Sequence, residues 1–375
     1  MGLRVYTGHA TRLAMREHLA TFVAVHAVLI FVALMIDFAE NFDSIRAAAD
    51  GGRLIPVLGK YVLYRVTDIT TRLMPVSALL GAFLAEIRRR ALLETVILAA
   101  SGVSALPTIA ALCWIGFITG GLQWKLERDW RPAAIFALVD LRAGEYAGRY
   151  VPGLTEKQYW FVRDDSAIVG HVLVGPEPEM RNVSYFIGLN GQGFDRLIKA
   201  QSVKPMGDGM WRFEQAEIWT SAGGNRLVGK PSPELDMPLW ITSERLQYLL
   251  PSPYFLPHDV LLARHVAQPD NAAVNTTIWR RYTAWFLPGL FAFLGASLAM
   301  TGFRGRVTRV PILVGMAFGG YLVSLSIKVF WALGELGAMS APFAVLVPSL
   351  LALGIGATLQ YILNREAHGR RLPLG

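Results

Sequence analysis

The sequence predicts an α-helical polytopic membrane protein with six transmembrane helices and an inserted all-β domain, which is a sandwich, a barrel or a jelly-roll-like fold. The chain of 375 residues is 53% hydrophobic and 17% charged, whereas soluble domains carry about 25% charged residues. Its hydrophobic residues gather in runs of about 18 or more, long enough to cross a hydrocarbon core of about 30 Å. Between the third and fourth of the long runs the hydrophobic period changes to two, which indicates β-strands.

We expect three segments along the chain. Residues 1–122 hold the first three transmembrane helices, residues 123–275 form the β domain with a short helix at 258–266 and a polar linker, and residues 276–375 hold the last three helices and a short tail. The first hydrophobic run, residues 19–36, follows a basic stretch, as in a signal peptide, but exceeds the roughly 7–15 residues of a signal-peptide core. We therefore predict that it is retained as the first helix.

Five further runs and one short segment complete the helical part. The short segment, residues 91–102, is amphipathic and too short to span, so it is either an ordinary loop helix or a helix that lies at the interface or docks on a partner. We predict spans at residues 61–87, 105–122, 282–303, 310–333 and 341–363.

The middle segment has the pattern of short antiparallel strands. Large hydrophobic residues alternate along it, for example at Trp160 and Val162 and at Trp211 and Phe213, and glycine-containing turns separate the runs. Trp211, Phe213 and Tyr185 either fill the core of the sheet or line an interior that accommodates lipid. Composition does not separate these two interpretations.

The distribution of charge predicts membrane topology rather than nucleic-acid binding. The net charge is +8, but residues 123–275 carry a net charge of −2 and the membrane-associated remainder carries +10. Basic residues concentrated in short loops mark the cytoplasmic side. We therefore expect a multi-pass protein of the bacterial inner membrane, with both termini cytoplasmic and the β domain periplasmic. The basic residues behind this prediction are Arg4, Arg12, Arg16, Arg88, Arg89, Arg90, Arg304, Arg306, Arg309, Arg365, Arg370 and Arg371.

The sequence lacks the motifs of catalysis and metal binding. Its nearest approach to a phosphate-binding loop, residues 224–231, has Pro231 where a serine or threonine is needed to reach Mg²⁺. No GxSxG or HExxH motif occurs, and no histidines pair at metal-ligand spacing. The single cysteine, Cys113, excludes an internal disulfide and is expected to be a buried small hydrophobic residue. We expect no catalytic residue, metal or cofactor in this chain.

Charged residues within the second span form the strongest candidate site. Arg65, Asp68 and Arg72 are spaced three and four apart, so they share one face of a helix. With Arg280 of the fourth span and Lys328 of the fifth, they could form a cationic rim at outer-leaflet depth for an anionic lipid headgroup. The alternative is a structural pairing around Asp68, with the other cations extended towards the interface. Both interpretations stay open.

Three local stretches resemble the lipopolysaccharide-export permease family LptF/LptG, and the resemblance covers essentially the whole chain. The end of the first helix, the strength of the second-helix match and the short C-terminal tail favour LptG. The matching stretches are residues 74–84 (MPVSALLGAFL) with Glu94 and residues 100–102 (ASG) following at the family's spacing, Trp279-Arg280 leading to Pro288, and Ala341-Pro342 with Pro348.

The resemblance implies six helices, a periplasmic jelly roll and a transporter subunit that is not itself an enzyme. It implies a heterodimer with a paralogous LptF-like permease on an LptB-like ATPase dimer, which binds ATP and Mg²⁺, beside an LptC-like bitopic protein. Lipopolysaccharide would leave the outer leaflet of the inner membrane and pass to a periplasmic bridge. The residues alone leave a second possibility open, which is a membrane-anchored periplasmic sensor or assembly protein with a ligand-binding β domain.

The resemblance also implies roles for individual residues. Glu94 matches the acidic position of the family's coupling helix, which docks on the ATPase, and Arg89 and Arg90 precede it. Family members hold lipid phosphates with basic residues, but Leu34 and Asp68 stand here where LptG members can carry lysine. The candidate substrate-binding residues are therefore Lys60, Arg65, Arg72, Arg280 and Lys328 in the helical part, and Tyr185, Trp211 and Phe213 in the β domain.

Overall fold

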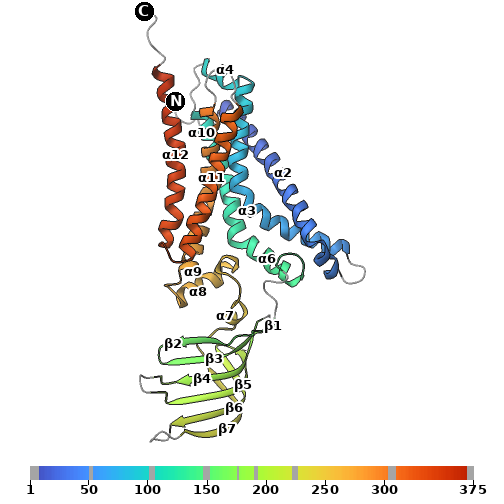
Figure 1. Ribbon diagram of the computed structural model, residues 1–375, viewed down its shortest axis with the longest axis vertical. Helices are drawn as coiled ribbons and strands as arrows, with labels where there is room; N and C mark the ends of the chain where they lie inside the picture. Colours follow the sequence, from blue (N-terminus) through green and yellow to red (C-terminus); the bar gives the residue numbers. More distant parts are fainter. Residues whose placement is uncertain are drawn as a thin grey trace, which may run out of the picture. The chain divides into compact units, whose positions relative to one another are not determined.

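The computed structural model describes residues 8–49, 54–100, 106–146, 153–174, 177–189, 193–221, 227–302 and 310–369. It separates into two compact units (Figure 1), a helical unit of Met1–Ala147 with Pro253–Gly375 and a sheet unit of Gly148–Ser252. The sheet unit contains fewer residues than the β-domain segment 123–275 that the sequence predicts. The difference arises because the chain stays helical beyond residue 123 and becomes helical again before residue 276.

Six helices in the described part of the chain are long and hydrophobic enough to span a membrane, as the sequence predicts. The first two are α2 (His9–Ala48) and α3 (Leu54–Ala91). The third, α5 (Leu106–Lys125), runs through a π-helical turn, η1 (Leu126–Trp130), into α6 (Arg131–Asp140). The fourth joins α9 (Ala272–Thr283) to α10 (Leu287–Gly302) through η3 (Ala284–Phe286), and the last two are α11 (Val310–Glu335) and α12 (Ala341–Gly369).

Short helices lie between these spans. α4 (Glu94–Ala100) follows α3 and lies at the same end of the helical unit as the start of α2 and the end of α12 (Figure 1). It occupies the centre of the predicted segment 91–102, whose last two residues lie outside the described residues, as does the basic loop between α10 and α11. η2 (Pro253–Phe255) and α8 (His258–Ala267) precede α9, and α8 confirms the predicted short helix.

The polar linker expected after α8 is in large part the start of α9. The Asn271 side chain accepts a hydrogen bond from the Val274 N–H (3.1 Å), which satisfies one of the free donors of the first helical turn. The residues from Asn271 to Asn275 therefore form the capped start of a helix rather than a linker. The helix of the fourth span begins before the hydrophobic run that predicted it.

Glycines let the helices of the central part approach closely. Gly116 of α5 faces Gly289 of α10 so closely that a Cβ atom on either one would meet the other's backbone. Gly120, one turn further along α5, lies directly against the carbonyl oxygen of Trp285. Side chains of α3 and α10 fill the remaining space, with Leu79 and other leucine, phenylalanine and methionine residues in one buried cluster.

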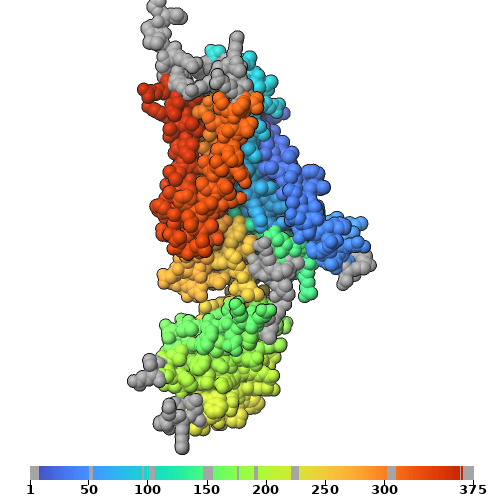
Figure 2. Space-filling view, in the orientation of Figure 1, coloured from blue at the N-terminus to red at the C-terminus, as the bar shows by residue number. Residues whose placement is uncertain are grey.

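α2, α11 and α12 lie on the surface of the helical unit (Figure 2). Many of their hydrophobic side chains are exposed. Phe31, Phe318 and Leu350, one from each helix, are 64%, 59% and 62% exposed. Cys113 of α5 is also exposed, so the expectation of a buried cysteine was wrong. A span that is hydrophobic on all sides has no polar face. Its sequence therefore does not show which residues, Cys113 among them, point outward.

The sheet unit is one open antiparallel sheet with the strand order β1-β3-β4-β5-β6-β7, and β2 also pairs with β3. From β3 onward each strand pairs with the next along the chain. Together with the six helices, this inserted sheet confirms the predicted fold class. The strands are β1 (Gly153–Leu154), β2 (Tyr159–Arg163), β3 (Ser166–Val174), β4 (Glu179–Ile187), β5 (Arg196–Gly207), β6 (Met210–Ser221) and β7 (Leu227–Pro238).

One face of the sheet carries the hydrophobic core of its unit. Phe161 of β2 is buried in that core, whereas Trp160 and Val162 are 61% and 64% exposed. The alternation of Trp160 and Val162 that predicted a strand therefore belongs to the face opposite the core. Three consecutive hydrophobic residues do not define a face, because a shift of one residue in a strand reverses every side chain.

Candidate functional site

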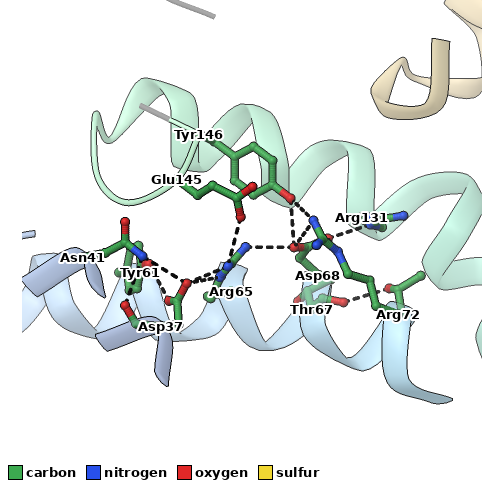
Figure 3. A network of polar contacts seen from close by, with 11 residues as sticks. Asp37, Asn41, Tyr61, Arg65, Thr67, Asp68, Arg72, Arg131, Glu145 and Tyr146 are labelled. Carbon is green, nitrogen blue, oxygen red and sulfur yellow. Dashed lines mark hydrogen bonds and ion pairs between the residues drawn. The ribbon is translucent and has the colours of Figure 1, made fainter. Parts of the chain in front are cut away.

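A buried carboxylate, that of Asp68 in α3, is the centre of the polar network in Figure 3. Its oxygens accept hydrogen bonds from Arg65 Nη1 (3.0 Å), Arg72 Nε (3.1 Å), Arg131 Nε (2.7 Å) and the Tyr146 hydroxyl (3.0 Å). The first two donors lie one turn before and after Asp68 on the same helix. The other two come from α6 and the segment that follows it, so residues distant in sequence converge on one carboxylate.

Asp37 of α2 forms the second half of this network. It accepts hydrogen bonds from Arg65 Nε (2.8 Å) and from the Tyr61 hydroxyl (2.6 Å), and Arg65 Nη2 also lies 3.3 Å from Glu145. Buried charges are stable where they are paired and hydrogen-bonded. In this network three guanidinium groups face three carboxylates, and their formal charges balance.

Tyr146 joins the network as a neutral donor. Burial, and next the negative charge of Asp68, raises the pKa of Tyr146. Its hydroxyl therefore stays protonated at neutral pH and donates to Asp68, while the Arg72 guanidinium contacts the same hydroxyl oxygen. Together these contacts fix the segment after α6 against α3.

The two arginines predicted to bind substrate differ in access. The Arg65 side chain is 10% exposed and is engaged by Asp37, Asp68 and Glu145, which is the geometry of the structural-pair interpretation. The Arg72 side chain is 40% exposed. Arg72 therefore keeps part of its guanidinium available to a ligand, whereas Arg65 does not.

Arg72 has two other predicted cations near it. Lys328 of α11 is exposed and lies close enough to Arg72 and to Arg280 of α9 for both charges to act on it. We call Arg72, Arg280 and Lys328 the cationic cluster. Lys60 lies twelve residues before Arg72 on α3, which is about 18 Å along a helix axis, so it is not part of this cluster.

Arg280 is the rigid member of the cationic cluster. Its Nη1 donates to Glu335 at 2.7 Å. Its guanidinium group also lies 4.2 Å from the ring centroid of Tyr254 and 4.2 Å from that of Trp331, which is the geometry of two cation–π contacts. Arg72 is held by Asp68, whereas the Lys328 side chain is exposed, so the cluster combines two held guanidinium groups with one exposed ammonium group.

The predicted coupling residues lie at the C-terminal end of α3 and the start of α4. The side chain of Glu94 is 25% exposed and its carboxylate lies 3.6 Å from Arg89 Nε. Arg89 is buried and bonded to Glu86 at 2.7 Å, and Arg90 donates to the Met300 carbonyl oxygen at 2.8 Å. Glu94 is therefore the accessible member of the three, while Arg89 and Arg90 point into the helical unit.

The predicted residues of the β domain lie together in the core of the sheet unit. Tyr185, Trp211 and Phe213 are 6%, 1% and 0% exposed. The Trp211 indole N–H donates to the Ile241 carbonyl oxygen (3.0 Å), and Leu246 of α7 (Ser243–Gln247) packs in the same core. The three side chains fill the core here, and their predicted contact with lipid would require the segment after β7 to move away.

Sequence reasoning missed five members of this network. It missed Arg131, Glu145 and Tyr146 because it assigned the chain after residue 123 to the β domain, and it missed Asp37 and Tyr61 because their contact joins two different helices. An available signal was the spacing of hydrophobic residues in α6, at one, three and four residues apart, which is helical. These residues, all buried, are Ala134, Ile135, Leu138 and Val139.

The chain matches a known protein family over most of its length, and its described residues offer no metal site. Among the residues that the structure describes, no group of three or more histidine, cysteine, aspartate or glutamate side chains could hold a metal ion. No individual curated protein matches the sequence. Residues 12–362, however, match the family described as "Lipopolysaccharide export system permease LptF/LptG", without distinguishing LptF from LptG. Because the match runs from α2 to α12 and includes the sheet unit, the chain belongs to the LptF/LptG family of lipopolysaccharide export permeases.

Proposed function

We propose that this chain is the LptG-type subunit of an ATP-driven exporter, which lifts lipopolysaccharide out of the outer leaflet of the inner membrane and passes it to a periplasmic bridge. The family match over residues 12–362 supports the export-permease part of this proposal. The choice of LptG rests on the end of the first helix and on the strength of the second-helix match. An LptF-like permease would be the dimer partner, with an LptC-like bitopic protein beside it. An LptB-like ATPase dimer would bind ATP and Mg²⁺, so this chain would need no cofactor of its own.

The surface of α4 supports the coupling part of the proposal. Glu94 offers a partly accessible carboxylate, and Leu92 and Ile97 beside it are 55% and 64% exposed. A helix with hydrophobic side chains next to a carboxylate suits a groove on a soluble partner. There an arginine of the ATPase would form a charge-assisted hydrogen bond with Glu94.

The cationic cluster supports the substrate part of the proposal. Phosphate groups of an anionic glycolipid form charge-assisted hydrogen bonds with guanidinium and ammonium groups. Arg72, Arg280 and Lys328 come from three different helices, so a movement of these helices would change their spacing and their affinity for the headgroup. Such a difference in affinity between two states is what allows ATP hydrolysis to drive the lipid onward.

The first test is affinity purification of the tagged full-length chain from native membranes, followed by mass spectrometry. Recovery of a soluble ATPase and a second six-helix permease is expected, and the sequence of that second permease decides whether this chain is the LptG or the LptF partner. Recovery of neither, under conditions that preserve other membrane complexes, would overturn the exporter proposal and favour a membrane-anchored sensor or assembly protein.

A further inference from the structure

One buried arginine joins α4 to the first span. Arg89, near the end of α3, lies 3.6 Å from Glu94 of α4 and 3.6 Å from Glu17 of α2, both measured from its Nε. Its Nη1 lies 2.7 Å from Glu86 and 3.1 Å from the Thr108 hydroxyl of α5. The Arg89 side chain is 3% exposed, so these contacts are shielded from solvent and weakly screened.

The carboxylates around Arg89 need its charge. Glu17 and Glu94 lie close enough to act on each other directly, and two like charges at short range repel. Glu86 is fully buried and also contacts His18 of α2 at 3.1 Å. Without the guanidinium group, Glu17 and Glu94 would lose the cation that both carboxyl groups contact, and with it the charge that links α2 to α4.

The turn between α3 and α4 contains a residue with an unfavourable backbone conformation. Leu93 has φ = 60°, a left-handed conformation that is unfavourable for a residue other than glycine. The turn brings Glu94 back to Arg89, five residues earlier. A strained conformation persists where surrounding contacts hold it, and the Ile97 N–H to Leu93 carbonyl bond (2.9 Å) is one of them.

α2 packs on α3 at Phe22, which lies against Gly81, and polar contacts join the two helices along their length. His18 meets Glu86, His26 Nδ1 lies 2.8 Å from the Ser77 hydroxyl, and Asp37 meets Arg65. The residue numbers rise along α2 as they fall along α3, as expected for antiparallel neighbours. Of the most hydrophobic 18 residues of α2, only 6% are buried, against 61% for α3. The first span is therefore the lightly packed element of the pair.

We infer that Arg89 is a positioning residue that couples α4 to the first span, so that a movement of α4 is passed to α2 as well as to α3. The inference rests on the proposed function in one respect, which is that an ATPase moves α4. It assigns a role to Glu17 as the acceptor of this link on α2, a residue that neither the sequence motifs nor the family match single out.

The test uses the purified complex of the full chain, with Arg89→Gln compared with Arg88→Gln as a matched control, because Arg88 is the exposed neighbour. Spin labels at Ala100→Cys on α4 and Leu13→Cys on α2, both exposed, report the distance between the two helices in a Cys113→Ser background. We expect Arg89→Gln to retain the ATPase and its hydrolysis of ATP, to lose at least about tenfold in lipid transport, and to lengthen and broaden the measured distance. Arg89→Lys should restore part of the transport.

A second variant guards against a folding defect in Arg89→Gln. Glu17→Gln removes the α2 end of the link and leaves the Arg89–Glu86 pair in place, so it should fold and show the same separation of ATP hydrolysis from transport. Wild-type transport and an unchanged distance in both variants would overturn the inference. If the wild-type chain binds no ATPase, the proposed function fails, whereas the distance in Arg89→Gln still reports whether Arg89 holds α4 to α2.

Discussion

At the scale of single residues, Asp68 explains how so many charges are accommodated within the helices. Its side chain is fully buried, and it accepts hydrogen bonds from four donors on two parts of the chain. Removing one partner of a buried ion pair costs about 3–5 kcal/mol, because the remaining charge is left uncompensated. Asp68→Asn replaces the carboxylate shared by Arg65, Arg72 and Arg131 with a neutral side chain. Arg65 keeps its contacts with Asp37 and Glu145, so the variant should lower the free energy of unfolding by about the lower end of that range.

The measurement is thermal unfolding of the purified protein in detergent. Asp43→Asn is the matched control, because Asp43 is an exposed aspartate on α2 and its loss should leave the melting temperature nearly unchanged. An Asp68→Asn variant as stable as the control would show that the network contributes little to stability, and the buried arginines would then need another explanation.

A second residue-scale prediction separates the two arginines of α3. Arg72→Gln and Lys328→Gln remove exposed cations of the cationic cluster, so each should reduce photo-crosslinking of lipopolysaccharide several-fold. Lys328→Gln should leave the melting temperature nearly unchanged, whereas Arg72→Gln also removes a donor to Asp68 and should lower it. Arg65→Gln instead leaves Asp37 without its guanidinium partner and should destabilise the protein. Crosslinking that persists in the Arg72→Gln, Lys328→Gln double variant would argue against the cationic cluster as the headgroup site.

At the scale of elements, the crossing of α5 with the fourth span depends on a glycine. A Cβ atom at Gly120 would overlap the Trp285 carbonyl oxygen, whereas one at the neighbouring Gly121 would meet nothing within 4 Å. Gly120→Ala should therefore destabilise the protein by about 1–3 kcal/mol through overpacking. Gly121→Ala should be neutral or stabilising, since alanine favours a helix over glycine by about 0.8–1 kcal/mol. Melting temperatures of the two variants in the same detergent make the comparison, and equal values would contradict the packing described here.

The elements that could be predicted from the sequence are those set by local pattern. The six spans follow from the length of their hydrophobic runs, and the strands around Tyr185 and Phe213 follow from alternation with turns. What could not be predicted depends on contacts distant in sequence. Arg131 reaches back 63 residues to Asp68, and no local period marks that meeting. Likewise the chain after residue 123 resembles a soluble domain in composition because η1 is charged, although it continues a helix.

The same distinction applies to the candidate sites. The spacing of Arg65, Asp68 and Arg72 correctly placed them on one face of a helix, but spacing cannot show that Arg65 is enclosed while Arg72 is half exposed. The sequence predicted Glu94 from its place in a family motif. It could not show that Arg89 points inward and contacts Glu94, because that contact depends on the turn at Leu93.

At the scale of the whole molecule, six spans return the chain to the side on which it starts, so α4 and both ends of the described chain share one side. The arginines of the short loops predict that this side is cytoplasmic. In a Cys113→Ser background, Met206→Cys on β5 and Leu92→Cys before α4, which are 52% and 55% exposed, provide the test. A membrane-impermeant maleimide, added to cells with a permeabilised outer membrane, should label Met206→Cys at once and Leu92→Cys only after the inner membrane is disrupted. The reverse pattern would place α4 in the periplasm, where no cytoplasmic ATPase could reach Glu94, and energy coupling through α4 would have to be abandoned.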